Sequence, residues 1–200
     1  MKNKDNHTRR SIMDAYIRLA QEKSCKKIKV REVSDAAFVQ RSTFYIYFEN
    51  IEHLLKTIED ELIENMVFYI RPDFYDPENV VPLKSIEGWF DYCKGNYSYI
   101  ITLMGENGDP EFEKKFKDKV CADINRMMDD EEMPKDALRP YCVELTYSIH
   151  FSVMKFALQV INEGADFNFD SYELTCLTNN WRSNAIKTEN EKGLSQTMKK

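Results

Sequence analysis

The chain has 200 residues, an apolar fraction of 42% and a formal net charge of −6 at pH 7. This length allows one large domain, or a small domain joined to a larger one, and the apolar fraction suffices for a core. No stretch approaches the ~20 apolar residues that a membrane helix needs, and the basic N-terminus runs into no apolar segment typical of a signal peptide. We therefore expect a cytoplasmic protein without membrane contact.

Cysteine usage excludes a second group of architectures. The five cysteines are odd in number, lie far apart and form no CxxC pair. This pattern argues against a disulfide framework and against a zinc site. We expect reduced thiols, no metal and no cofactor.

Charge is divided unevenly along the chain. Residues 1–50 carry 11 Lys/Arg against 6 Asp/Glu, whereas the remainder carries 17 against 28. A basic head on an acidic body suggests that only the head meets a polyanion. A charge run can also be a solvated face, so the asymmetry alone does not decide between these interpretations.

Three helices are predicted at the start of the chain. Apolar residues at spacings of 3 and 4 predict a helix over about 8–23. A short second helix is predicted around 30–37 and a third over 43–48, with a turn at 38–40 between them. This arrangement is a helix-turn-helix, and "RSTFYIYF" (41–48) is its predicted recognition helix.

The rest of the chain also has helical rather than alternating periodicity. Asn50 is a suitable N-cap for a fourth helix that would continue to about Arg71, before Pro72. After a break at 72–82, further helices are predicted over about 83–104, from Asp109 onward, over 136–163 and from 170 to about 186. The sequence thus predicts an all-α protein.

The rings of the recognition helix separate by face. Phe44 and Phe48 are four residues apart and are predicted to point inward. Tyr45 and Tyr47 are predicted to point elsewhere, where a ring or hydroxyl can meet a thymine methyl, a sugar or a phosphate oxygen. The alternative is that both tyrosines merely pack the small domain.

Two segments resemble a known family. "VREVSDAAFVQRSTFYIYFENIEHLL" (30–55) resembles the DNA-binding signature of TetR-type transcriptional regulators, and "LMGENGDPEFEKKFKD" (103–118) resembles the C-terminal region of one branch. The resemblance implies an all-helical homodimer. A three-helix helix-turn-helix DNA-binding domain (1–50) would precede a larger helical domain (51–200) for effector binding and dimerisation.

Carried over by position, the resemblance implies a set of DNA contacts. One group of residues would contact the bases, and a second group, together with the start of the fourth helix, would contact the DNA backbone. The predicted DNA-binding residues are Arg31, Arg41, Ser42 and Tyr45 for bases, Thr43 and Tyr47 for the backbone, and Gln40 beside them.

Four positions depart from the family pattern. Phe38 stands where the turn usually has glycine, and a left-handed conformation there would cost a non-glycine residue ~1–2 kcal/mol. Gln40 replaces the usual small N-cap, Lys29 replaces a Ser/Thr cap, and Ile51 replaces a lysine that often meets a phosphate in relatives. Because of these departures, the sequence determines neither the operator sequence nor whether DNA binding is weakened.

The body is predicted to dimerise. Residues 141–161 hold 14 apolar residues and two formal charges, so this helix should be buried on more than one side. The last helix supplies a matching stripe, and a monomer with a thick core is the alternative. The predicted interface residues are Phe156, Val160, Leu174, Leu177 and Trp181.

An effector cavity is predicted from aromatic and thioether side chains in the body. Apolar walls with a few polar groups are typical of such pockets, although the same residues also suit plain core. His150 in particular suits a hydrogen-bonded core histidine. The predicted lining is Tyr92, Tyr97, Met104, Phe116, Tyr147, His150, Phe151 and Met154.

No enzyme motif was found, and the three histidines lie far apart. The sequence predicts a non-enzymatic, ligand-responsive regulator, a repressor, that binds a palindromic double-stranded operator as a dimer and responds to an unknown small molecule. The fourth helix would transmit effector binding to the head, because a change in its tilt would alter the spacing of the two heads on DNA. The alternative is that this helix is a rigid connection. The competing hypothesis is a dimeric helical protein whose head binds a protein partner or has lost DNA binding.

Overall fold

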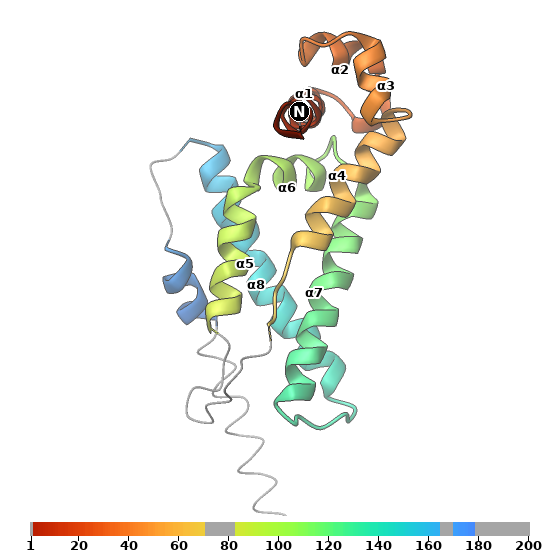
Figure 1. The fold of residues 1–200 in the computed structure, drawn as a ribbon. Helices are drawn as coiled ribbons and strands as arrows, with labels where there is room; N and C mark the ends of the chain where they lie inside the picture. Colours follow the sequence, from red (N-terminus) through yellow and green to blue (C-terminus); the bar gives the residue numbers. More distant parts are fainter. Residues whose placement is uncertain (1, 71–82, 165–169, 179–200) are drawn as a thin grey trace, which may run out of the picture. The chain divides into compact units, whose positions relative to one another are not determined.

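The computed structural model describes residues 2–70, 83–164 and 170–178, and every regular element in these ranges is a helix. The all-α prediction is confirmed. The individual helices are labelled in Figure 1. The chain divides into two compact units: unit 1 comprises residues 1–66 and 96–117, and unit 2 comprises 67–95 and 118–200. The predicted boundary at residue 50 differs from this division, since unit 1 also takes in the fourth helix and a later stretch of chain.

Unit 1 contains the head of the chain and a segment from its middle. Five elements come from the head: α1 (Lys2–Glu22), η1 (Cys25–Lys27), α2 (Val30–Ala36), α3 (Arg41–Tyr47) and α4 (Ile51–Asn65). The middle segment supplies α6 (Tyr97–Met104) and the first part of α7 (Pro110–Asp130).

The loop between α6 and α7 is bonded to the head. The Cys25 backbone N–H donates to the Asn107 carbonyl at 2.7 Å, and its Sγ donates to the Gly108 carbonyl at 3.2 Å. Tyr16 donates from its hydroxyl to the Cys25 carbonyl at 3.3 Å. Burial raises the pKa of the Cys25 thiol, so the thiol stays protonated as a donor. These bonds explain why α6 joins the helix-turn-helix in one unit.

An ion pair between a buried carboxylate and an exposed lysine joins α4 to the start of α7. The Glu59 side chain is buried, and Lys115 Nζ donates to its Oε2 at 2.6 Å. Burial raises the pKa of the Glu59 carboxyl, and the bond from Lys115 offsets this effect only in part. Unit 1 thus contains a carboxylate whose ionised form is disfavoured by its surroundings.

Unit 2 contains α5 (Leu83–Gly95), the second part of α7, α8 (Arg139–Asn162) and a helical stretch at 171–178. The non-helical segment 67–70 is bonded to α7, because the Phe68 backbone N–H donates to the buried Asp123 carboxylate at 3.0 Å. The Phe68 ring packs edge-on against Trp89 and His150, with centroids 5.2 and 5.1 Å apart. This segment is therefore a strap across the core of unit 2.

The strap explains why the fourth helix is shorter than predicted. It ends at Asn65 rather than near Arg71, so the prediction was wrong there. Met66 has extended backbone dihedrals, and Phe68 and Tyr69 are both buried. Tyr69 also donates to Asp130 at 2.8 Å. Further helical turns would withdraw the Phe68 N–H and its ring from these partners.

Other boundaries also differ from the prediction. The expected helix over 83–104 is two helices, because the chain breaks at Gly95 and Asn96. The first helix begins at Lys2 rather than residue 8, since its polar start contains no breaker although it has no apolar stripe. The third begins at Arg41 rather than Thr43. The expected end of the last helix near residue 186 lies outside the described residues.

Candidate nucleic-acid interface

Helix α2 is held on α1 at both of its ends. Lys23 at the end of α1 pairs with Glu32 in the first turn of α2, and Glu32 also accepts from the Lys29 backbone N–H at 3.0 Å. Arg18 donates to the Ala36 carbonyl at 3.2 Å near the other end. The hydrogen bond from Lys23 is the main reason that the pKa of Glu32 is lowered. Lys29 thus precedes α2 without a side-chain capping bond, and the Glu32 N–H donates instead to the Lys29 backbone carbonyl at 2.9 Å.

The turn between α2 and α3 has a left-handed residue at Phe38, with φ of 55°. The N–H groups of Phe38 and Val39 donate back to the carbonyls of Asp35 and Ser34, at 3.2 and 3.0 Å. The Phe38 side chain is 96% exposed, so no packing compensates for the backbone cost. Phe38 thus adopts the left-handed conformation that is costly for a non-glycine residue, and the turn is made without glycine.

Helix α3 has a sharp division between its faces. Phe44 and Phe48 are buried, with ring centroids 5.7 Å apart, as predicted. Tyr45 is 57% exposed, and Tyr47 is partly exposed. Gln40 precedes the helix as N-cap without a side-chain capping bond. The two phenylalanines thus fix the helix to the unit 1 core and turn the opposite face outward.

The outward face of α3 collects most of the predicted DNA contacts. An α-helix turns roughly 100° per residue, so positions 41, 45, 42 and 46 follow one another around an arc of roughly 140°. All four side chains on this arc are exposed, and Thr43 and Tyr47 flank it as partly exposed residues. We call this surface the recognition arc, and its members are Arg41, Ser42, Tyr45 and Ile46.

Arg31 lies on α2 rather than on the recognition arc. Its Nε is 3.6 Å from Asp35 Oδ2, and both side chains are largely exposed. Such an i,i+4 pair contributes little in water, so the guanidinium can exchange it for another anion at low cost. The predicted role of Arg31 remains a prediction.

Sequence reasoning missed four exposed residues of the helix-turn-helix region. Ile46 belongs to the recognition arc and is 74% exposed, whereas Lys26, Lys27 and Lys29 are exposed just before α2. The lysines were visible in the charge count of the head but were not assigned a contact. For Ile46 the helical wheel was the available signal, since it follows Ser42 by four residues.

The start of α4 lies beside the recognition helix. Asn50 caps α4 by accepting from the His53 backbone N–H at 2.7 Å, which confirms the predicted cap. His53 Nδ1 accepts in turn from the Glu49 backbone N–H at 3.1 Å, and its ring meets Phe48 edge-on at 6.1 Å. Ile51, in the first turn, is partly exposed.

The predicted effector-pocket residues fall into both compact units. Tyr97, Met104 and Phe116 belong to unit 1, and the others belong to unit 2. In unit 2 the Tyr147 and Phe151 rings stack with centroids 5.0 Å apart. The remaining members in unit 2 are Tyr92, His150 and Met154, of which the last two are buried.

His150 lies within this aromatic region of unit 2. Its ring is fully buried, and Nδ1 lies 2.8 Å from the Thr146 carbonyl, to which it can donate. Its ring also neighbours Phe90, with centroids 6.4 Å apart. These contacts are those of a core histidine, so an effector would have to displace packed side chains to reach it.

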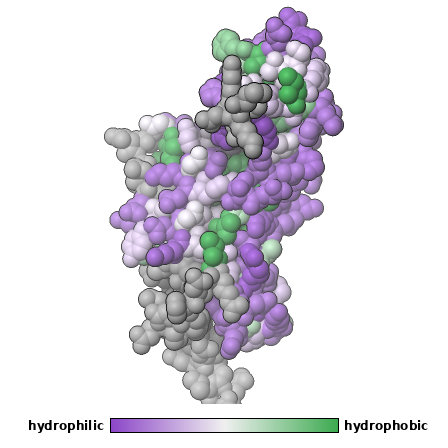
Figure 2. All heavy atoms as spheres, in the orientation of Figure 1, coloured by the Kyte–Doolittle hydropathy of each residue, from purple (hydrophilic) through white to green (hydrophobic). Residues whose placement is uncertain are grey.

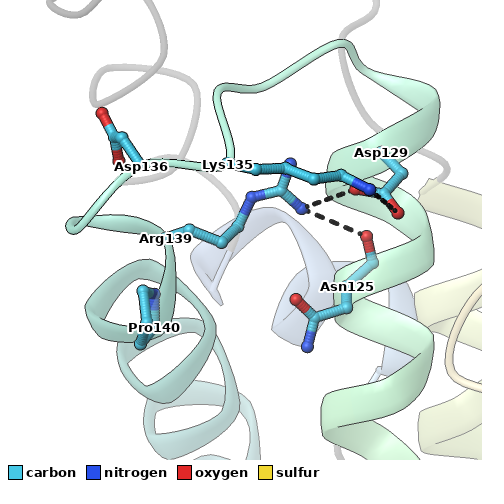
Figure 3. Close-up of a pocket in the computed structure, with 6 residues that line it drawn as sticks. All are labelled: Asn125, Asp129, Lys135, Asp136, Arg139 and Pro140. Atoms are coloured by element: carbon cyan, nitrogen blue, oxygen red, sulfur yellow. Dashed lines mark hydrogen bonds and ion pairs between the residues drawn. The ribbon is translucent and has the colours of Figure 1, made fainter.

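A separate pocket of about 290 Å³ opens where α7 meets α8 (Figure 3). The Arg139 side chain crosses it and donates to Asp129 Oδ1 and the Asn125 carbonyl, at 3.0 and 3.3 Å. Lys135 also donates to Asp129, at 3.0 Å, and this bond is the main reason that the pKa of Asp129 is lowered. The charged groups of this pocket therefore hold the helix connection together, and none belongs to the predicted effector lining.

The predicted dimer residues are partly placed. Phe156 is 66% exposed on α8, Val160 and Leu174 are partly exposed, and Leu177 is exposed at 171–178. Trp181 lies outside the described residues. Within 171–178, the residues turned inward are hydroxyl-bearing rather than apolar, namely Ser171, Thr175 and Thr178.

The described residues hold neither a metal-binding cluster nor a membrane-spanning helix. They contain no group of three or more His, Cys, Asp or Glu side chains arranged to hold a metal ion. None of the described helices has the length and hydropathy to cross a membrane.

Comparison with known proteins identifies relatives of the helix-turn-helix region and of the overall fold. Residues 12–58 match the family model of the bacterial regulatory proteins of the tetR family. No curated protein matches the chain. The predicted resemblance of the helix-turn-helix to TetR-type regulators is thereby confirmed.

Solved structures share the fold along most of the chain. A TetR transcriptional regulator from Streptococcus agalactiae is 23% identical with a TM-score of 0.55, covering 88% of this chain and 94% of that one. The dihydroxyacetone kinase operon activator DhaS is 18% identical with a TM-score of 0.54, covering 90% and 97%. FadR from Bacillus subtilis, solved with stearoyl-CoA, is 19% identical with a TM-score of 0.50, covering 84% and 94%. The chain therefore has the fold of TetR regulators.

Proposed function

We propose that this protein is a dimeric transcriptional regulator that binds double-stranded DNA through the recognition arc of α3. The observation that carries the proposal is the division of this helix into two faces. Phe44 and Phe48 are buried, while Arg41, Ser42 and Tyr45 of the recognition arc are all exposed. A helix held from behind in this way can enter the major groove and present its outward side chains to base edges.

The side chains of the recognition arc suit distinct parts of the duplex. Arg41 can donate two hydrogen bonds to the O6 and N7 atoms of guanine, whereas Ser42 and Tyr45 can donate to or accept from a neighbouring base. Thr43 and Tyr47 flank the arc and suit the phosphate backbone, with Gln40 at the start of the helix. Lys26, Lys27 and Lys29 are exposed and add positive charge on the approach to α2.

Dimerisation through α8 is the second part of the proposal. Tyr141, Leu145 and Phe156 lie on one side of α8, since a turn of roughly 100° per residue brings them within about 60° of one another, and all three are exposed. Leu177 adds an exposed apolar side chain at 171–178. A second copy covering this surface would place two recognition helices about a two-fold axis, and a palindromic operator would match that symmetry.

Regulation by a small molecule is the third part. We place the effector site in unit 2 near the aromatic region around His150, where Phe68 of the strap also packs. Helix α4 leads from the recognition helix directly into this strap, but it is 15 residues long, hence about 22 Å. An effector that prefers one position of the strap would bias α4 by no more than its differential affinity for the two states. If the effector releases the protein from DNA, the protein would act as a repressor whose target genes are transcribed once the effector binds.

The test is a binding selection followed by a salt titration. The full-length protein is used to select duplexes from a random library, and affinity is then measured at several salt concentrations. A palindromic consensus is expected, and log K should fall with log salt by roughly 0.9 per phosphate contact. If no sequence is enriched, or if binding does not depend on salt, the proposal fails in favour of a head that binds a protein partner or has lost DNA binding.

A further inference from the structure

Ile46 occupies a place on the recognition arc where its neighbours are polar. It is 74% exposed and follows Ser42 by four residues, so the two side chains are separated by roughly 40° around the helix. Tyr45 precedes it on the same outward side and is 57% exposed. An aliphatic side chain thus lies beside a hydroxyl and a phenol that are proposed to contact DNA.

The fold does not need an apolar side chain at this position. Phe44 and Phe48 already fill the inward side of α3, and both are buried. Alanine would serve a seven-residue helix better than β-branched isoleucine, because its helix propensity is higher. The role of Ile46 is therefore to be sought in what α3 contacts.

The surface around Ile46 is too polar for a broad apolar contact. Arg41 and Ser42 share the recognition arc with it, and both are exposed. On the face shown in Figure 2, hydrophobic residues form small patches separated by hydrophilic ones. Such a setting favours contact with one small apolar group over docking of an apolar protein surface.

We propose that Ile46 is a specificity-determining residue that packs against the C5 methyl group of a thymine in the major groove. This inference rests on the proposed function. The thymine methyl is the apolar group that unmodified base pairs present in that groove, and it distinguishes T·A pairs from the others. Isoleucine suits this contact because its χ1 is nearly fixed in a helix, so little rotamer entropy is lost on binding.

The test replaces thymine by deoxyuracil, which removes the methyl group and keeps every hydrogen-bonding atom. In the selected operator, each thymine of a half-site is replaced in turn, and affinities are measured for the unmodified protein and for Ile46→Ala. At one position per half-site, the unmodified protein should lose about fourfold in affinity, since burying one methyl group is worth ~0.8 kcal/mol and 1.4 kcal/mol is tenfold. Ile46→Ala should bind both operators equally.

Leu138→Ala serves as the matched control, because it shortens another exposed aliphatic side chain outside the helix-turn-helix. This variant should discriminate thymine from uracil as the unmodified protein does. If Ile46→Ala keeps the discrimination, or if the unmodified protein shows none, the inference is overturned while the proposed function stands. If no duplex is enriched in the selection, the proposed function fails and the inference falls with it.

Discussion

Helices α3 and α8 both expose large apolar side chains, but they do so in different surroundings. On α3 the exposed Tyr45 and Ile46 are interleaved with Arg41 and Ser42. On α8 the exposed Tyr141, Leu145 and Phe156 lie on one side of a 24-residue helix, with the small Ser152 exposed between the last two. A mixed surface can form hydrogen bonds with base edges and pack against their methyl groups, whereas large exposed apolar side chains on one side of a long helix favour an apolar partner.

The difference shows that exposure of an apolar residue does not by itself identify a contact. The two helices differ in the side chains that surround each exposed apolar residue and in the length over which such residues recur. Seven residues on α3 offer a few point contacts, and α8 offers more than three times that length. The following predictions separate the two surfaces, beginning with the largest expected effect.

Phe156→Glu should weaken the dimer by roughly 2–4 kcal/mol, since it would place a charge in the middle of the proposed apolar interface. Sedimentation velocity over a range of protein concentrations would measure the change. Ala122→Glu is the control, because it adds the same charge at an exposed position on α7 in unit 2. A Phe156→Glu variant that dimerises like the unmodified protein would show that this side of α8 is not the interface.

Arg41→Ala should cost ~1–3 kcal/mol on the selected operator and relax the preference at one base pair, as expected for loss of a bidentate contact to guanine. Fluorescence anisotropy with the operator and a scrambled duplex measures both quantities. Thr43→Ala is the comparison, because loss of a backbone contact should weaken both duplexes about equally. Unchanged sequence preference in Arg41→Ala would remove this residue from the base contacts.

Phe38→Gly should raise the free energy of unfolding by about 1 kcal/mol, because it relieves a left-handed backbone whose side chain makes little packing contact. Glu132→Gly is the matched case in unit 2, since Glu132 is also exposed and also has φ of 55°. Urea denaturation of both variants measures the gains. A loss of stability in Phe38→Gly alone would show that the exposed ring contributes to the native state.

Glu59→Gln should change how stability depends on pH. A raised pKa in the folded state means that folding binds a proton, so this contribution is present below the ordinary carboxyl pKa of ~4.3 and is lost as pH rises through the folded value. The variant lacks this loss and should become more stable relative to the unmodified protein as pH rises from 4.5 to 7. Denaturation at several pH values measures the difference.

Glu64→Gln is the control for this pH series, because Glu64 lies on the same helix α4 and is exposed. Its stability difference from the unmodified protein should stay nearly constant across the same range. A constant difference for Glu59→Gln would mean that Lys115 fully compensates the buried carboxylate.

The sequence by itself determined the features that depend on neighbouring residues. The buried pair Phe44 and Phe48, the cap at Asn50 and the left-handed turn at Phe38 all follow from spacing, side-chain chemistry or motif register. The start of α7 at Pro110 agrees with the helix predicted from Asp109 onward, and proline suits the first helical turn because it needs no backbone N–H there. Such signals lie within a few residues of the structure that they specify.

Tertiary structure decided where distant segments meet. Helix α4 ends at Asn65 because Phe68 finds its acceptor in Asp123, 55 residues further along the chain. Unit 1 includes α6 because Cys25 bonds to the loop that contains Gly108. Ile46 was overlooked because aliphatic residues usually support the core, and burial became known only once Phe44 and Phe48 were seen to fill it. Local patterns specify which residues can be helical, but long-range packing decides where each helix stops and which of its faces remains exposed.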